Sequence, residues 1–210
     1  MQKISWLDAN SYDLIVQVLE NGGVVAGLSD TVPGLLACAT DREKAALDGI
    51  KGRSEKPYIV LAASLPMVLE LIAPECAMRF NDLINKAWPG PITLVFKTHP
   101  AKIVLYGPTI AVRIPDYEPL QRLLVRVGPL YSTSANSAGR PTPTSIEAIE
   151  QAIADKVDLV VSEMPVPEAG THNVASALLD CTGQEIRVVR SREPIVSHLE
   201  QQLRMRFVRY

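Results

Sequence analysis

Apolar residues along this chain recur at two spacings, one typical of amphipathic helices and one typical of buried strands. Over 11–20 the apolar positions share one helical face, with Asn10 or Ser11 as the cap and Asn21-Gly22-Gly23 as the end. Further helices are predicted over 41–50, 65–73, 77–87, 117–127, 144–154 and 194–205. Strands are predicted over 24–28, 35–39, 58–62, 92–96, 110–114, 130–132, 157–161, 174–180 and 185–190.

Two of these helices carry recognisable start signals. Asp41 is predicted to cap the helix over 41–50, and Thr144 the helix over 144–154, with Glu147 completing a capping box. Strands and helices alternate without strict βαβ repetition. The pattern therefore predicts an α/β fold, with one twisted mixed sheet flanked by helices.

Length and composition set the scale of this fold. A chain of 210 residues with a hydrophobic fraction of 47% suits one compact unit with a large core, and nothing in the composition marks a split. We expect a single domain over residues 1–210. The net charge of -2 provides no global basic field, so any anion site must be local.

The three cysteines, Cys38, Cys76 and Cys181, are widely spaced and have apolar neighbours, which is typical of buried thiols in a reducing compartment. The N-terminus lacks a signal peptide, and no apolar run of about 18 residues predicts a membrane span. We expect a cytoplasmic protein that does not contact membranes.

Polar and basic clusters fall at the ends of predicted strands, where α/β sheets collect ligands. They are Ser29-Asp30-Thr31, Lys51/Arg53/Lys56, Thr109/Arg113 and Ser132/Ser134/Asn136. Each cluster has two interpretations. The basic loop suits a polyphosphate or a solvated helix end. The strand arginine either meets an anion in a cleft or faces water, and the stretch LYSTSANSAGRP forms a polar cradle or a Ser-rich connector.

Common catalytic motifs are absent from the sequence. It contains no GxxxxGK[ST] or GxGxxG loop and no GxSxG elbow, and its three histidines lack a triad-like context. A catalytic nucleophile is therefore not expected, and any ATP site must use another design.

Taken in order, a series of segments resembles the motifs of the YrdC-like family, the threonylcarbamoyl-AMP synthases. The segments are GGVVAGLSDTVPGL, IKGRSEKP, WPGPITLVF, TIAVRIPD, STSANSAGRPT, NVASALLD and IRVVR. The match covers nearly the whole chain, which resembles the short bacterial type. The resemblance implies a single YrdC-like α/β domain around a cleft. It also implies formation of L-threonylcarbamoyladenylate and pyrophosphate from L-threonine, bicarbonate or CO2, and ATP, with Mg²⁺ accompanying ATP.

The resemblance also implies roles for individual residues, and none as a protein metal ligand. ATP would be bound by Lys51, Arg53, Lys56, Thr109, Ser134, Asn136, Thr142 and Arg190, with Lys51 and Arg53 also as the catalytic pair. L-threonine would be bound by Ser29, Thr31, Arg113, Ser132 and Ser176. Pro33 stands where the family usually has an aromatic residue, and the KxR loop is one residue shorter before Lys56. These departures leave the amino-acid selectivity open.

Two alternatives compete with the synthase. One is a YrdC-like paralogue that binds nucleotide or RNA without this reaction. The other is an RNA-binding accessory module, which the net charge and the lack of interleaved aromatic residues disfavour. The KxR and SxN residues are both present and favour the enzyme, whose downstream partners would be the proteins that transfer threonylcarbamoyl to tRNA. Weak RNA binding remains an open expectation.

Overall fold

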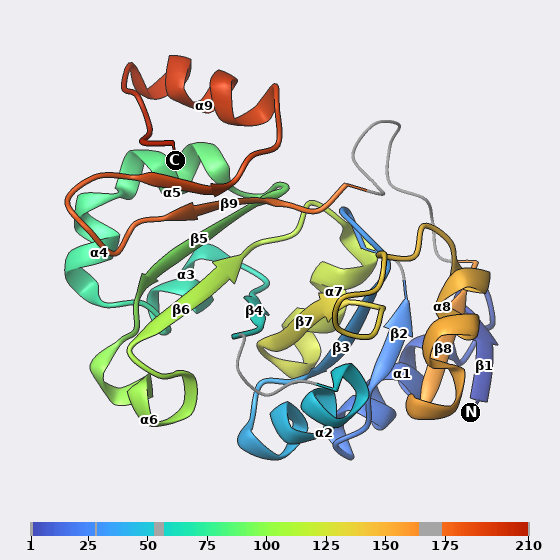
Figure 1. The fold of residues 1–210 in the computed structure, drawn as a ribbon. Helices are drawn as coiled ribbons and strands as arrows, with labels where there is room; N and C mark the ends of the chain where they lie inside the picture. Colours follow the sequence, from blue (N-terminus) through green and yellow to red (C-terminus); the bar gives the residue numbers. More distant parts are fainter. Residues whose placement is uncertain (1, 28, 53–56, 164–173, 210) are drawn as a thin grey trace.

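The computed structural model describes residues 2–27, 29–52, 57–163 and 174–209 (Figure 1). The strands are β1 (Gln2–Ser5), β2 (Val25–Gly27), β3 (Gly34–Cys38), β4 (Ile59–Leu61), β5 (Ile92–Lys97), β6 (Thr109–Arg113), β7 (Leu130–Ser134), β8 (Leu159–Ser162), β9 (Ala177–Asp180) and β10 (Arg187–Arg190). The α-helices are α1 (Ser11–Glu20), α2 (Asp41–Lys51), α3 (Leu65–Leu69), α4 (Pro74–Arg79), α5 (Asn81–Ala87), α6 (Ile103–Tyr106), α7 (Glu118–Val127), α8 (Ile146–Ile153) and α9 (Ile195–Leu203). Short 3-10 turns span Pro100–Lys102 and Ala154–Lys156.

The strands form one ten-stranded sheet in the order β1-β8-β2-β3-β7-β4-β6-β5-β9-β10. Four neighbouring pairs are parallel (β1 with β8, β2 with β8, β4 with β6, β5 with β9), and the other five are antiparallel. The α/β class with one mixed sheet flanked by helices is therefore confirmed. Among the described helices, none has the length and apolar character that a membrane crossing requires.

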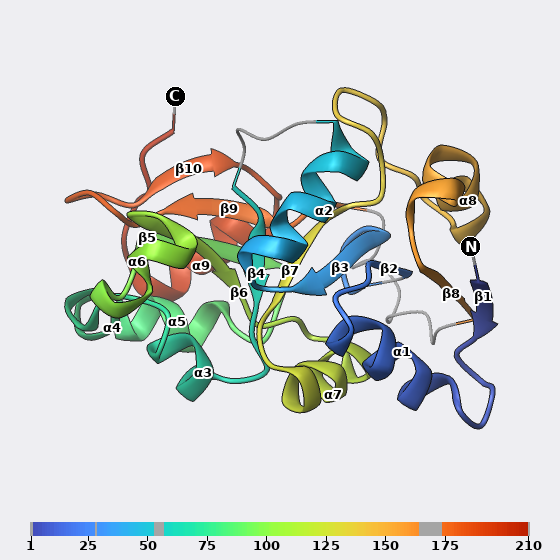
Figure 2. The same ribbon diagram turned by 90° about the horizontal axis from the view of Figure 1, so that it is seen from below.

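Side-chain alternation along the strands divides the core between the two faces of the sheet. Val25, Leu36 and Leu130 pack with the apolar stripes of α1 and α7. Their neighbours Val24 and Leu35 belong to the other cluster, to which α2, α5, α8 and α9 contribute. Figure 2 shows α1 and α7 on one side of the β2–β3–β7 part of the sheet, and α2 and α8 on the other.

Helix and strand boundaries differ from the predictions where tertiary contacts override local pattern. The helix predicted over 77–87 is two helices, α4 and α5, which meet at Phe80. The backbone leaves helical geometry there, and the Phe80 ring packs 5.8 Å from that of Phe96. Strand β1 was not predicted, because its sequence lacks an apolar pattern and it is held by backbone pairing with β8. Strand β7 runs on to Ser134 because β3 pairs with Thr133 and Ser134, beyond the residues that pair with β4.

Two of the predicted caps are wrong, and a third is confirmed in position only. Thr40 rather than Asp41 precedes α2, and its hydroxyl donates to the carboxylate of Glu43. Ser145 rather than Thr144 caps α8, because its hydroxyl accepts the Ala148 N–H at 3.2 Å. Asn10 precedes α1 without a side-chain capping bond.

Candidate functional site

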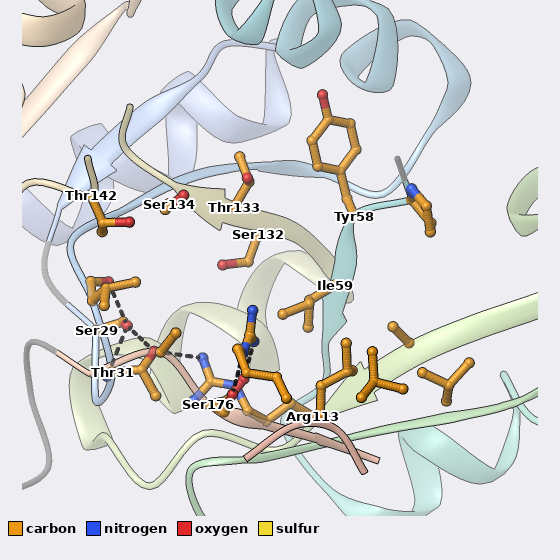
Figure 3. Close-up of a pocket in the computed structure, with 18 of the residues that line it drawn as sticks. Ser29, Thr31, Tyr58, Ile59, Arg113, Ser132, Thr133, Ser134, Thr142 and Ser176 are labelled. Carbon is orange, nitrogen blue, oxygen red and sulfur yellow. Dashed lines mark hydrogen bonds between the residues drawn. The ribbon is translucent and has the colours of Figure 1, made fainter. Parts of the chain in front are cut away.

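A cavity of about 550 Å³ opens where the middle strands of the sheet meet the β2–β3 turn and the segment before β9 (Figure 3). Its lining residues are Ser29, Thr31, Val32, Pro57, Tyr58, Ile59, Val95, Thr109, Ala111, Arg113, Ser132, Thr133, Ser134, Thr142, Ala175, Ser176, Leu178, Val189 and Arg190. Segments from both halves of the chain therefore converge on one hollow.

Strand register builds the floor of this cavity. Ser132 of β7 pairs with Ile59 of β4, Ile59 with Ala111 of β6, and Ala111 with Val95 of β5. These residues form a row across neighbouring strands, and all of them line the cavity. Because side chains alternate along a strand, Arg113 lies on the same face of β6 as Ala111. The row places small and apolar side chains beside the polar ones.

Arg113 reaches the cavity as half of a buried ion pair. Its Nη1 lies 2.5 Å from Oδ1 and 2.6 Å from Oδ2 of Asp30, and both side chains are 3% exposed. The Asp116 N–H also donates to Asp30 Oδ2, at 3.2 Å. The strand arginine thus faces the cavity rather than solvent, and a carboxylate compensates its charge.

The turn that carries Asp30 is organised by its flanking hydroxyls. Ser29 Oγ accepts the Thr31 N–H at 3.1 Å and donates to the Val32 carbonyl at 3.0 Å. The Thr31 hydroxyl lies 3.1 Å from Ser29 Oγ. Figure 3 shows Ser29, Thr31 and Thr142 on one side of the hollow and Tyr58 and Ile59 on the other. The hydroxyls therefore present a fixed polar wall opposite a mainly apolar one.

A third group of contacts joins Ser176, Thr93 and Arg190. Thr93, which is fully buried, has its hydroxyl 2.8 Å from Ser176 Oγ. Arg190 donates from Nε to the Ser176 carbonyl at 2.7 Å and from Nη2 to Ser176 Oγ at 3.2 Å. Burial lowers the pKa of Arg190, and the nearby charge of Arg113 lowers it further. Two guanidinium groups thus lie within electrostatic reach of each other at this end of the cavity.

Lys51 lies behind the cavity wall instead of lining it. Its ammonium donates to the Ser134 carbonyl at 2.7 Å, to Asn136 Oδ1 at 3.0 Å and to the Asn136 carbonyl. Asn136 Oδ1 also accepts from Ser134 Oγ at 2.5 Å. Lys51 is only 3% exposed, so it ties the end of α2 to the turn after β7.

Most residues predicted for the site meet in this cavity. They are Ser29, Thr31, Thr109, Arg113, Ser132, Ser134, Thr142, Ser176 and Arg190. Lys51 and Asn136 adjoin it through Ser134, and Arg53 and Lys56 lie outside the described residues.

Sequence reasoning assigned no role to several residues of the site. Asp30 and Thr93 form hydrogen bonds to residues that line the cavity, and Tyr58 and Thr133 line the cavity themselves. The sequence offered one signal for Asp30, which is a carboxylate inside a hydroxyl-rich turn. It offered none for Thr93, and the partners of both residues lie 83 positions away along the chain.

The cavity's side chains fit a ligand rich in oxygen. Its described lining contains hydroxyls and two guanidinium groups, with no Cys, His, Asp or Glu. Such a lining binds and orients anions and offers no carboxylate, imidazole or thiol for covalent chemistry. Throughout the described ranges, no group of three or more His, Cys, Asp or Glu side chains could hold a metal ion.

A model of the family that comprises Sua5, YciO and YrdC proteins, described as telomere recombination, matches residues 17–191. The chain belongs to the Sua5/YciO/YrdC family. Two relatives in it are named threonylcarbamoyl-AMP synthase. That of Blochmanniella pennsylvanica is 34% identical over 72% of this chain and 81% of its own length. That of Pyrococcus abyssi is 33% identical over 68% of this chain but only 44% of its own length.

A solved structure of this family has the same fold. P. abyssi Sua5 complexed with L-threonine has a TM-score of 0.84 and 24% identity over all of this chain and 62% of that one. Relatives in this family thus share the fold, although some are much longer than the present chain.

Proposed function

We propose that this Sua5/YciO/YrdC protein is an L-threonylcarbamoyladenylate synthase, which uses L-threonine, bicarbonate or CO2, and ATP and releases pyrophosphate. The observation that carries the proposal is the single cavity in which Arg113, Arg190 and a set of hydroxyls converge. The names of the relatives support it. So does the L-threonine held by the similar Pyrococcus protein. The product would pass to proteins that transfer threonylcarbamoyl to tRNA, in the cytoplasm.

L-threonine would lie against Arg113. The arginine Nε is buried and has no hydrogen-bond partner among the described residues, and Nη2 makes only a 3.4 Å contact with Thr31 Oγ1. Nε and Nη2 form one edge of the planar guanidinium, which matches the two oxygens of a carboxylate. Ser29, Thr31, Ser132 and Ser176 would surround the rest of the amino acid.

ATP would occupy the part of the cavity near Thr109, Ser134, Thr142 and Arg190. Arg53 and Lys56, which follow α2, would add positive charge for its phosphates. Mg²⁺ would arrive with ATP, because this ion keeps several waters and binds mainly through substrate phosphates in such sites. The absence of an acidic cluster in the described part of the chain fits a metal held mostly by its substrate.

The chemistry asks the protein to position its substrates. The threonine amine attacks CO2 and loses a proton, which gives a carbamate. A carbamate oxygen then attacks the α-phosphorus of ATP, and the bond to the β-phosphate oxygen breaks as pyrophosphate leaves. Guanidinium and hydroxyl donors fixed in place before the reaction stabilise the charge that develops. The described lining has no His, Asp or Glu to activate a hydroxyl as a nucleophile, and this scheme does not need one.

The test is pyrophosphate release with ATP, Mg²⁺, bicarbonate and each amino acid in turn. We expect release that depends on threonine. Arg53→Ala is expected to cut turnover by about 100-fold or more, because a donor to transition-state charge is worth that much. Arg126→Ala, an exposed arginine on α7, is the control and should retain wild-type activity. Salt-dependent RNA binding without pyrophosphate release would refute the synthase and favour the RNA-binding alternative.

A further inference from the structure

The guanidinium of Arg113 is held in one orientation by a carboxylate that does not line the cavity. Both carboxylate oxygens of Asp30 accept short hydrogen bonds from Arg113 Nη1, and one of them also accepts the Asp116 N–H. Both members of the pair are buried, so neither can reorient without leaving a charge unpaired. The orientation of the cavity arginine is therefore set from outside the cavity.

This arrangement decides which edge of the guanidinium is available. Because Nη1 donates to Asp30, the Nε–Nη2 edge of the guanidinium is the one with remaining hydrogen-bonding capacity among the described residues. The Nε group, which has no hydrogen-bond partner in the part of the chain that the structure describes, is a second and independent observation. Buried N–H groups in proteins are rarely left unpaired. A two-oxygen anion fits this edge better than a single-oxygen ligand does.

The Asp30 carboxylate also affects the arginines that lie near Arg113. Arg190 and Arg192 both lie close enough to Arg113 for its charge to lower their pKa, after the larger effect of burial. Asp30 acts in the opposite direction on Arg192 and raises its pKa. Asp30 thus offsets repulsion within a group of arginines and keeps Arg113 in place beside Arg190.

We propose that Asp30 is a positioning residue for the amino-acid substrate. It turns the Nε–Nη2 edge of Arg113 toward the substrate carboxylate and acts on the ligand only through Arg113. The inference rests on the proposed function, since it takes the ligand of Arg113 to be L-threonine. A purely structural role for Asp30 would predict lost stability without a selective change in threonine binding.

The test is a double-mutant cycle with Asp30→Asn, Arg113→Gln and both together. L-threonine binding to the full chain is measured by calorimetry, and the KM values for threonine and ATP are measured separately. We expect Asp30→Asn to weaken threonine binding by about tenfold to a hundredfold, the scale of a misplaced binding group, and to leave the KM for ATP nearly unchanged. In the Arg113→Gln background, Asp30→Asn should add no further loss.

The controls separate the possible failures. Asp155→Asn, at an exposed position, is the matched control and should bind threonine like the wild type. If Asp30→Asn does not fold, the threonine affinities of Arg113→Gln and of the double variant are compared instead, because neither variant retains the buried guanidinium. Equal affinities in these two variants support the proposal. Unchanged affinity in Asp30→Asn, or losses that add in the double variant, would overturn it. A wild-type protein that neither binds threonine nor releases pyrophosphate would instead refute the proposed function.

Discussion

Replacement of Lys51 by methionine distinguishes a structural tie from a phosphate ligand. The Lys51 ammonium has three N–H donors. Acceptors among the described residues include the Ser134 carbonyl and both oxygens of Asn136. The Ala138 N–H in turn donates to the Lys51 carbonyl at 3.0 Å. Methionine keeps much of the apolar stem and removes only the charge and the donors.

The expected loss follows from the acceptors left behind. A buried acceptor without a donor costs about 1–3 kcal/mol. Asn136 Oδ1 keeps its bond from Ser134 Oγ, so the two carbonyls carry most of the loss. The sum is about 2–4 kcal/mol, after allowance for water at the neighbouring exposed turn. At about 2–4 °C per kcal/mol for a chain of this size, the melting temperature should fall by roughly 4–16 °C.

Thermal and urea unfolding of Lys51→Met measure this loss, and ATP binding to the folded variant is followed in parallel. Lys44→Met is the matched control on the same helix, because Lys44 is partly exposed and pairs with Asp48 four residues on. A helical pair four residues apart contributes about 0.3–0.5 kcal/mol. A Lys51→Met protein as stable as the Lys44→Met control, but without ATP binding, would show that Lys51 contacts phosphate and does not secure the turn.

Two further predictions concern the other buried polar groups. Thr93→Val keeps the shape of the side chain but leaves the Ser176 hydroxyl without its 2.8 Å partner. We expect threonine affinity to fall about fivefold, equivalent to about 1 kcal/mol. Thr93→Ser should restore it, and equal affinities in the two variants would contradict the role. The hydrogen bond from Arg209 lowers the pKa of Glu200 from 4.5 to about 2. A carboxyl with a depressed folded pKa stabilises the protein above pH 4.5, and this contribution is lost as the pH falls toward 2. The melting-temperature gap between wild type and Glu200→Gln should therefore shrink from pH 7 to pH 3, and a constant gap would refute the assignment.

The local sequence was sufficient for much of the fold. The apolar face of α1 and the apolar run of β6 needed only spacing to be recognised, because helix and strand periods are local properties. The chemistry of the site was also present in the residue types. Hydroxyls, amides and cations without a triad-like histidine indicate a site that binds anions, wherever the chain places them.

Local pattern failed where a distant partner decided the outcome. The helix predicted across Phe80 breaks because its ring packs on Phe96 of β5. The sequence alone did not decide whether Arg113 faces solvent or a cavity. The register of β6 with β4 and β5 places it on the face that lines the cavity. Asp30 and Lys51 gained their roles from partners more than 80 positions away.

The sequence by itself therefore determined the secondary-structure classes, the mixed character of the sheet and the kind of ligand its polar residues suit. Only the tertiary structure decided that Asp30 orients Arg113, that Lys51 points inward to the turn after β7, and that Thr93 supports Ser176. The physical reason is that ion pairs and hydrogen bonds form between atoms a few ångströms apart. Strand order and register, which depend on packing of the whole chain, set those distances.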